Sequence, residues 1–193
     1  MSNKRVLICG CVAAILLILS PWPAWADEYW SLSPAQSGDW SVPGNWGGGA
    51  VPTSSDTAYI VNGGTAGVAS IGPVCGTLSL GGTAGSGSLQ MTGGSLYAAS
   101  HEYVGNSGTG TFTQSGGTNT LTFFTLGNNA NGNGTYSLND SGVLSTGWVT
   151  VGNYGTGTFT QTGGNNTPSF VYIGNYAHSS GTYSLSGTGQ FSA

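Results

Sequence analysis

The sequence predicts an all-β fold: a parallel β-solenoid of about five coils with a β-rich cap at its N-terminal end. The first sign is a repeat, because the ten residues that begin at Gly108 return at Gly155 with one substitution, 47 residues later. The second is that short segments with apolar residues at every other position alternate with Gly-rich turns, a pattern typical of strands. Stacked repeats are the architecture in which such short units bury their apolar faces.

Residues 1–26 are expected to be a signal peptide that is removed. Lys4 and Arg5 form a basic start, residues 6–20 are apolar, and Ala24-Trp25-Ala26 supplies the small-x-small pattern of a cleavage site. The apolar stretch of 15 residues is shorter than the roughly 20 that cross a bilayer, so a cleaved signal is favoured over a membrane anchor. We therefore expect a secreted or bacterial cell-surface protein with no membrane span after cleavage.

The chain beyond the leader contains no Lys or Arg. Lys4 and Arg5 are the only such residues, while all six acidic residues remain, which gives residues 27–193 a formal charge of −6. Binding to nucleic acid depends on Lys and Arg near the phosphates, so that class of partner is excluded. Phosphate sites built on Arg or Lys are excluded for the same reason.

One cysteine, Cys75, remains beyond the leader, so an intramolecular disulfide is excluded. We expect its thiol to be a small buried core group, with an intermolecular bridge as the alternative. The 36 glycines would suit a disordered chain, but low charge and 11% aromatic residues are the reverse of the composition of disorder. The repeated apolar positions favour an ordered array.

Residues 27–75 are expected to form the cap. They hold Trp40 and Trp46 among proline turns, followed by a strand-like run from Asp56 to Val61. An array of repeats needs an atypical end that covers its first coil, and tryptophans packed inside such an end fit that role. A Trp-lined sugar site in this segment is the alternative.

Residues 76–193 are expected to form the coils, each anchored on an aliphatic residue followed by Gly-Asn. The anchoring glycines, Gly105, Gly127, Gly152 and Gly174, are 22, 25 and 22 residues apart. Two kinds of coil alternate, one with Thr-Phe-Thr-Gln and one with Thr-Tyr-Ser-Leu. The side chains expected to face the interior are Val104, Leu126, Val151, Ile173, Phe124, Val149, Val171, Leu89, Phe112, Tyr136, Phe159 and Tyr183.

Glu102 interrupts one inward column, where the other coils have Phe or Val. We expect the cap to splay this first coil. The alternative is a buried carboxyl with a partner such as His101 or a water molecule, because an unpaired buried charge is costly.

Aromatic residues recur at outward positions, four and two residues before the anchoring glycines. An exposed aromatic column is unusual on a soluble protein, and aromatic faces bind the apolar faces of sugars. The candidate glycan-contact residues are His101, Tyr103, Phe123, Trp148, Phe170 and Tyr172, which we call the aromatic ladder.

No catalytic residue, metal ligand or cofactor site is predicted. Glycoside hydrolysis needs two carboxyls within about 5–10 Å, but Glu102 and Asp140 occupy different slots of different coils. Calcium-binding repeats need an Asp in each turn, where this chain has Asn and Gly. Thr-x-Thr columns resemble the flat faces of ice-binding solenoids, but Ser in alternate coils breaks their regularity.

The motifs together resemble those of secreted bacterial β-strand-repeat proteins. The resemblance rests on the Trp–Asn-Trp–Gly–Pro–Asp-x-Ala-x-Ile run and on the copies of Val-Gly-Asn and Gly-Thr-Gly-Thr-Phe-Thr-Gln-x-Gly-Gly, and it covers residues 39–193. Those are large extracellular proteins, often with an autotransporter-associated or PEP-CTERM-type architecture. The resemblance implies a surface-exposed or released β-solenoid. No C-terminal anchor or sorting motif follows, so we expect truncation from a longer protein, with self-association through an uncapped coil edge as the alternative.

The predicted function is therefore a non-catalytic structural or adhesive repeat protein outside the cell. Carbohydrate binding through the aromatic ladder is the first alternative, and a polysaccharide-active β-helix enzyme is the second. The expected partners are glycans or further copies of the chain.

Overall fold

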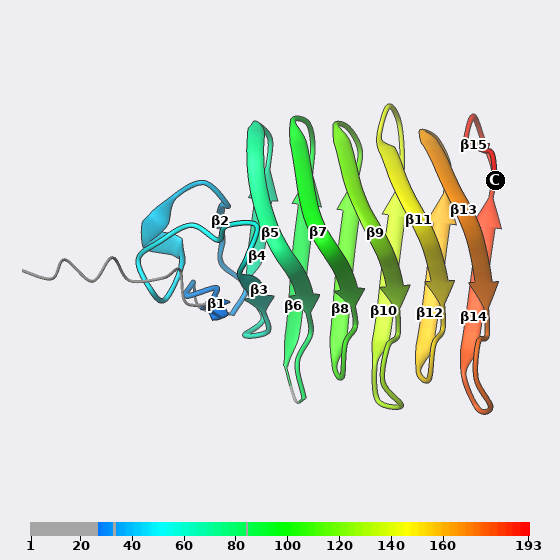
Figure 1. Cartoon of the computed structure of the whole chain (residues 1–193), viewed down its shortest axis with the longest axis horizontal. Coiled ribbons are helices and arrows are strands. Elements are labelled where there is room, and N and C mark those ends of the chain that lie inside the picture. Colours follow the sequence, from blue (N-terminus) through cyan, green and yellow to red (C-terminus); the bar gives the residue numbers. More distant parts are fainter. Residues whose placement is uncertain (1–26, 33, 84) are drawn as a thin grey trace, which may run out of the picture.

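The computed structural model describes residues 27–193 except residues 33 and 84, so the expected leader lies outside the described residues. These residues form one parallel β-solenoid of about six turns (Figure 1), which confirms the predicted fold with about one turn more than expected. A 3-10 helix, Pro43–Asn45, lies in the cap. The strands are β1 (Asp27–Tyr29), β2 (Ser37–Asp39), β3 (Thr57–Ile60), β4 (Thr65–Val68), β5 (Ile71–Leu80), β6 (Ser86–Met91), β7 (Ser95–Val104), β8 (Thr109–Gln114), β9 (Thr118–Leu126), β10 (Asn133–Leu138), β11 (Val143–Val151), β12 (Thr156–Gln161), β13 (Asn165–Ile173), β14 (Ser180–Leu185) and β15 (Gln190–Phe191).

Odd- and even-numbered strands form two separate parallel sheets. The sheet of eight strands has the order β1-β3-β5-β7-β9-β11-β13-β15, and the sheet of seven has the order β14-β12-β10-β8-β6-β4-β2. From β5 onward each complete turn gives one long strand to the first sheet and one short strand to the second (Figure 1). Because β3 pairs with β5 and β4 with β6, the stacking begins inside the segment 27–75, before residue 76.

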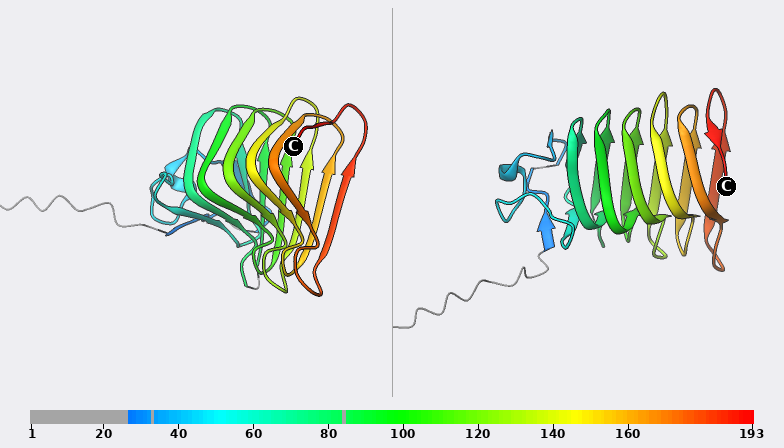
Figure 2. Two further views of the ribbon diagram at one scale, coloured as in Figure 1. Left: turned by 45° about the vertical axis from the view of Figure 1, so that its right-hand side comes forward. Right: turned by 45° about the horizontal axis from the view of Figure 1, so that its top comes forward.

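The long strands bend in the middle, which gives each coil three outward faces (Figure 2, left). In β9 the alternation of inward and outward side chains breaks at Thr122 and Phe123, which are both exposed. The pairing of β7 with β9 is irregular at the same level, between Ala98 and His101. The three faces are formed by the short strands, by the N-terminal halves of the long strands and by their C-terminal halves.

The interior is filled by the inward columns that the sequence predicts. The fully buried members are Leu89, Phe112, Tyr136, Phe159, Val104, Leu126, Val151, Phe124 and Val149. Burying one such side chain contributes roughly 1.5–3 kcal/mol, which stabilises a chain whose described part has no Lys or Arg to form salt bridges. In the last described coil, Ile173 is 53% exposed and Val171 and Tyr183 are half-buried, because no further complete described turn lies over them.

The 47-residue spacing has a structural cause, which is a hydrogen bond between the two kinds of coil. The hydroxyl of Tyr136 donates to Oε1 of Gln114 in the preceding coil at 2.5 Å, and Tyr183 donates in the same way to Gln161. Nε2 of each Gln donates to two backbone carbonyls. Because a buried Gln needs such partners, each Phe/Gln coil is completed by the Tyr/Leu coil that follows it.

Glycine and asparagine close the corner after each long strand. The four anchoring glycines have φ values between 65° and 76°, a range that other residues rarely adopt. A Cβ at Gly105 would also lie 2.3 Å from the carbonyl of Asn133. The asparagine that follows each anchoring glycine belongs to an amide ladder that runs from coil to coil. In it, Nδ2 of each asparagine donates to Oδ1 of the equivalent asparagine in the coil before; the donors Asn128, Asn153 and Asn175 do so at 2.9, 3.1 and 2.9 Å.

Three buried tryptophans hold the cap together. Trp30, Trp40 and Trp46 are 3%, 0% and 2% exposed. The rings of Trp40 and Trp46 meet edge to face at 4.8 Å, and Nε1 of Trp46 donates to the carbonyl of Trp40 at 2.8 Å. Since no sugar can reach these ring faces, the hypothesis of a Trp-lined sugar site in the cap is wrong, and the tryptophans form a core.

Glu102 is buried and pairs with Leu78 and Phe124 of the two neighbouring long strands, so the expected splaying is wrong. Its side chain is 0% exposed, and Nδ2 of Asn119 donates to its Oε2 at 2.8 Å. His101 is not the partner, because Oε1 of Glu102 has no hydrogen-bond partner; Nδ1 of His101 lies 2.6 Å from Oγ of Ser100. Burial raises the pKa of the Glu102 carboxyl to about 8, the bond from Asn119 acting in the opposite direction, so the group is neutral at pH 7.

Candidate functional site

The aromatic ladder lies on one face of the solenoid, formed by the C-terminal halves of β7, β9, β11 and β13. In this sheet His101 pairs with Phe123, Phe123 with Trp148, and Trp148 with Phe170. Tyr103 and Tyr172 occupy the second outward column of the same face. Phe123, Phe170 and Tyr172 are 38%, 51% and 41% exposed, while the other three side chains are half-buried. The structure therefore brings all six candidate residues to one surface.

The ladder rings stack on one another rather than lie flat on the sheet. His101 and Phe123 have centroids 4.6 Å apart and planes 16° apart, and Trp148 and Phe170 have centroids 4.3 Å and planes 25° apart. Two nearly parallel rings with centroids at these distances must lie face to face, because rings that lie side by side in one plane have centroids farther apart. The ring faces thus point along the solenoid axis, and the ring edges face the solvent.

The stack has a break and an open end. Between Phe123 and Trp148 the centroids are 6.2 Å apart and the planes are tilted by 32°. Trp148 also stacks on Tyr172, with planes 4° apart at 5.9 Å. Beyond Phe170 and Tyr172 the next strand, β15, pairs only with Asn165 and Asn166 at the start of β13. One face of each of these two rings is therefore not covered by a paired strand.

Partial burial changes the titration of two ladder residues. It lowers the pKa of the His101 imidazole below its usual value and raises that of the Tyr103 phenol. Both shifts favour the neutral form. The ladder is therefore an uncharged surface around neutral pH.

A hydroxyl-rich surface lies on the face formed by the short strands. Its two outward columns are in exact register from β8 to β14 and consist of Thr111, Thr135, Thr158 and Thr182 in one column and Thr113, Ser137, Thr160 and Ser184 in the other. The Thr-x-Thr columns predicted from the sequence are thus present, with Ser in every second coil of the second column.

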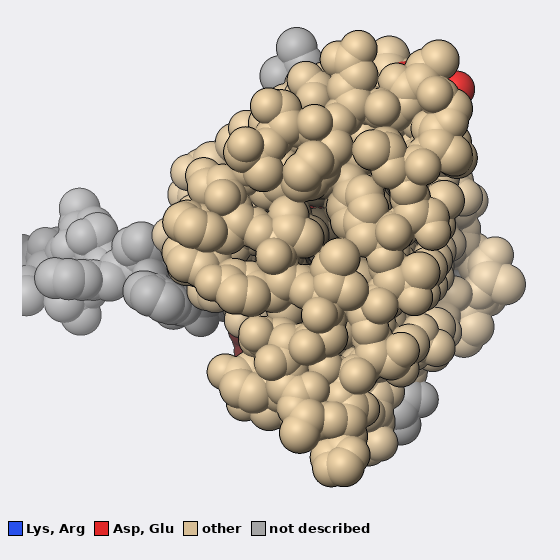
Figure 3. Space-filling view, turned by 90° about the vertical axis from the view of Figure 1, so that its right-hand side faces the viewer, with Lys and Arg blue, Asp and Glu red and all other residues tan. Residues whose placement is uncertain are grey.

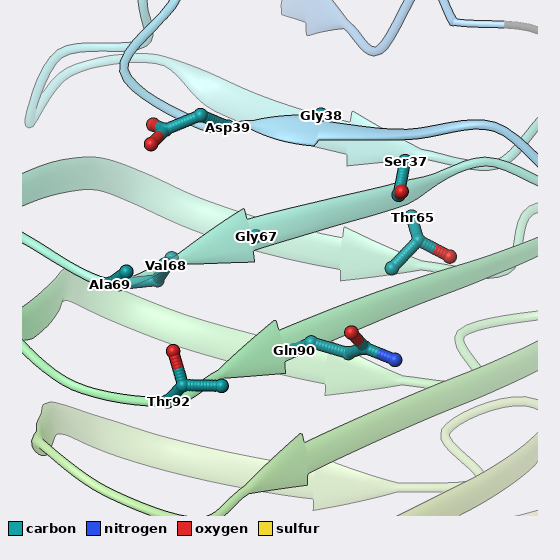
Figure 4. Close-up of a pocket in the computed structure, with 9 residues that line it drawn as sticks. All are labelled: Ser37, Gly38, Asp39, Thr65, Gly67, Val68, Ala69, Gln90 and Thr92. Atoms are coloured by element: carbon teal, nitrogen blue, oxygen red, sulfur yellow. The ribbon is translucent and has the colours of Figure 1, made fainter.

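A shallow hollow of about 280 Å³ opens at the N-terminal end of this hydroxyl face (Figure 4). Its lining residues are Ser37, Gly38, Asp39, Thr65, Gly67, Val68, Ala69, Gln90 and Thr92. The hollow arises partly because Gly67 has no side chain between Asp39 and Gln90. The Asp39 carboxylate accepts bonds from N and Oγ of Ser41 at 2.7 and 2.6 Å, which lower its pKa, so it is a turn-forming group.

The described residues contain no group of three His, Cys, Asp or Glu side chains that could hold a metal ion. The buried carboxyl of Glu102 has no contact with solvent, and the Cys75 thiol is buried as expected, with its pKa raised by that burial. Within the described chain, no helix is long and apolar enough to span a membrane.

The end of the solenoid formed by β13, β14 and β15 is apolar. Val171, Ile173, Tyr183, Leu185 and Phe191 line a hollow of about 400 Å³ there. Figure 3 shows this end with almost no charged side chains. The last described coil thus exposes apolar side chains on this end.

A second aromatic feature lies at a corner and was not predicted. Tyr154 and Tyr176 each follow a Gly-Asn pair, and their rings stack at 4.2 Å with planes 2° apart. They are 47% and 50% exposed. The tripeptide Gly-Asn-Tyr at 152–154 and 174–176 is the signal in the sequence that could have revealed this pair.

Comparison of the chain with protein-family models, with curated proteins and with solved structures found no match.

Proposed function

We propose that the chain is a non-catalytic structural or adhesive repeat protein of the secreted bacterial β-strand-repeat type, located outside the cell or on its surface. The observation that supports this proposal best is the stacking of the outward rings from coil to coil. An aromatic side chain whose ring face packs against the ring of the next coil stabilises the stacking of the coils. The surface aromatics, the amide ladder and the core columns then all stabilise the contact between successive coils.

The leader-like start and the composition support the extracellular part of the proposal. A signal peptide implies export, and a chain without Lys or Arg beyond residue 26 avoids binding nucleic acid. An apolar end formed by Ile173, Leu185 and Phe191 would allow contact with a further coil or a second copy.

The test is the stability of Trp148→Ala. Trp148 contacts three other rings, and each such pair contributes about 0.5–1.5 kcal/mol, so the expected loss in the free energy of unfolding is about 2–4 kcal/mol. The matched control is Tyr97→Ala, because Tyr97 is 47% exposed and contacts no ring in the described chain. Equal, small losses in both variants would contradict the structural role of the ladder.

Carbohydrate binding is the second candidate, and the open ring faces of Phe170 and Tyr172 favour it. Sugars stack on aromatic faces, and these two rings are 51% and 41% exposed. The unmodified chain is tested on a glycan array. We expect Tyr172→Ala to abolish binding to every glycan that the unmodified chain binds, and Tyr97→Ala to leave that binding unchanged. No binding by the unmodified chain would reject this candidate. Enzymatic cleavage of polysaccharides is not favoured, because Glu102 is buried against Asn119.

A further inference from the structure

The Tyr154–Tyr176 pair is the feature that the proposed function does not use. Both residues lie in the turn after a long strand, and their backbone N–H groups donate to the carbonyls of Asn128 and Asn153 at 3.1 Å. The equivalent turn residues of the two preceding coils, Ser107 and Asn129, are polar and hydrogen-bonded to each other. The tyrosines are thus held on neighbouring coils by a regular corner.

The two phenol rings are stacked face to face with nearly parallel planes. Their centroids are 4.2 Å apart and their planes differ by 2°. The hydroxyl of Tyr176 acts on that of Tyr154 and raises the pKa of the Tyr154 phenol. Since the rings are stacked and their hydroxyls interact, the hydroxyl ends of the two rings lie on the same side of the stack, which brings the ortho carbons of one ring near those of the other.

The described chain has few other ways to join its coils covalently. It contains one cysteine, which is buried, so no disulfide can form within it. It contains no Lys, so no isopeptide bond can form. Tyrosine remains, and this pair is both stacked and about half exposed to solvent.

We infer that Tyr154 and Tyr176 are a site of oxidative cross-linking, at which a dityrosine bond joins two neighbouring coils. The oxidant is hydrogen peroxide acting through a haem peroxidase. Each phenol loses one electron and one proton to give a phenoxyl radical, whose unpaired electron is shared with the ortho carbons. The two radicals form one carbon–carbon bond between ortho carbons, and each ring then moves its ortho hydrogen as a proton to its oxygen. In total the protein loses two hydrogen atoms, and one peroxide is reduced to two molecules of water.

The test treats the purified chain with peroxidase and hydrogen peroxide at micromolar protein concentration. Dityrosine fluorescence is measured, and mass spectrometry of the digest identifies the joined peptides and the loss of two hydrogen atoms. Groups held side by side have an effective concentration of millimolar or above, so the internal link should exceed links between molecules by on the order of a thousandfold. Its yield should not change on dilution, and the product should remain a monomer on a denaturing gel.

Tyr154→Phe and Tyr176→Phe are each expected to abolish this link, because Phe keeps the stacked ring but cannot form a phenoxyl radical. Circular dichroism confirms that both variants fold. Tyr97→Phe is the matched control, since Tyr97 is equally exposed and unstacked, and the link should persist in it. N-acetyltyrosine in the same reaction confirms that the oxidant works. The inference is overturned if the joined peptides do not contain both Tyr154 and Tyr176, if the yield falls on dilution, or if the protein forms no dityrosine while N-acetyltyrosine does.

Discussion

The buried carboxyl of Glu102 makes the stability of the solenoid depend on pH. Its Oε2 accepts the bond from Asn119 at 2.8 Å, while its Oε1 has no hydrogen-bond partner and the side chain is 0% exposed. Burial raises the pKa of this group from 4.5 to about 8. The folded state therefore keeps a proton that the unfolded state releases above pH 4.5.

The sign and size of the effect follow from this difference in pKa. A folded pKa above the unfolded value gives a contribution that is fully present below pH 4.5 and is lost as the pH rises through about 8. Within that window the free energy of unfolding falls by about 1.4 kcal/mol per pH unit. The loss is about 3 kcal/mol at pH 7 and about 5 kcal/mol in total, by the same relation.

Glu102→Gln removes the titrating group and keeps an oxygen to accept the bond from Asn119. We expect the free energy of unfolding at pH 7 to rise by about 3 kcal/mol, which is roughly 6–12 °C in Tm for a chain of this size. Between pH 6.5 and 8 the Tm of the unmodified chain should fall, and that of the variant should be flat. Thermal unfolding followed by circular dichroism measures both.

The control is Asp140→Asn, because Asp140 is exposed and its positive φ of 46° suits Asn. This variant should keep the pH dependence of the unmodified chain. Burial lowers the pKa of His101, so the stability it contributes is lost as the pH falls through 6.5; at the lower edge of the window this makes the Tm rise with pH, opposite in sign to the effect of Glu102. If Glu102→Gln lowers the Tm at pH 7, or the unmodified chain shows no slope, the carboxyl is ionised and stabilising, and the reasoning is refuted.

Two further predictions concern the packing of the coils. Tyr136→Phe leaves the buried Oε1 of Gln114 without its donor, so the free energy of unfolding should fall by about 1–3 kcal/mol, and adding Gln114→Leu should recover part of that loss. A double-mutant cycle in urea measures the coupling, and independent effects would disprove the two-coil unit. Gly152→Ala places a Cβ 2.2 Å from the carbonyl oxygen of Ser180 at a φ of 76°, and should cost at least about 2 kcal/mol. Gly44→Ala, with no atom within 4 Å of the new Cβ, should leave the Tm nearly unchanged; equal Tm values for the two variants would count against the corner geometry.

The fold and most of the core could be predicted because strand periodicity determines the direction of each side chain. Alternation places Phe112 and Tyr136 inward, and both are fully buried. The bend in the long strands could not be predicted in this way. At Thr122 and Phe123 two consecutive residues are exposed, so the period shifts within one strand without a glycine or proline to mark it.

The hydrogen-bond partner of Glu102 lies in the next coil and in a different inward column. The residues of the column that contains Glu102 therefore could not predict this partner. Asn119 is inward-facing and fully buried in β9, at the register position of Leu96 and Leu144. Either polar residue alone disrupts an apolar column. Considered together, a carboxyl and an amide at inward positions 17 residues apart predict a buried pair.

The orientation of the ladder rings decides how the surface can work, and periodicity gives no information about it. Alternation places Trp148 and Phe170 outward, but only the 4.3 Å stacking shows that their faces are turned toward each other. A sugar that stacks on rings has access to Phe170 and Tyr172 at the open end, and elsewhere it meets ring edges. The hydroxyl columns on the short strands run in register from β8 to β14 and would offer adhesion a continuous surface along the solenoid. The same array can thus hold its coils together with one face and present another face to a partner.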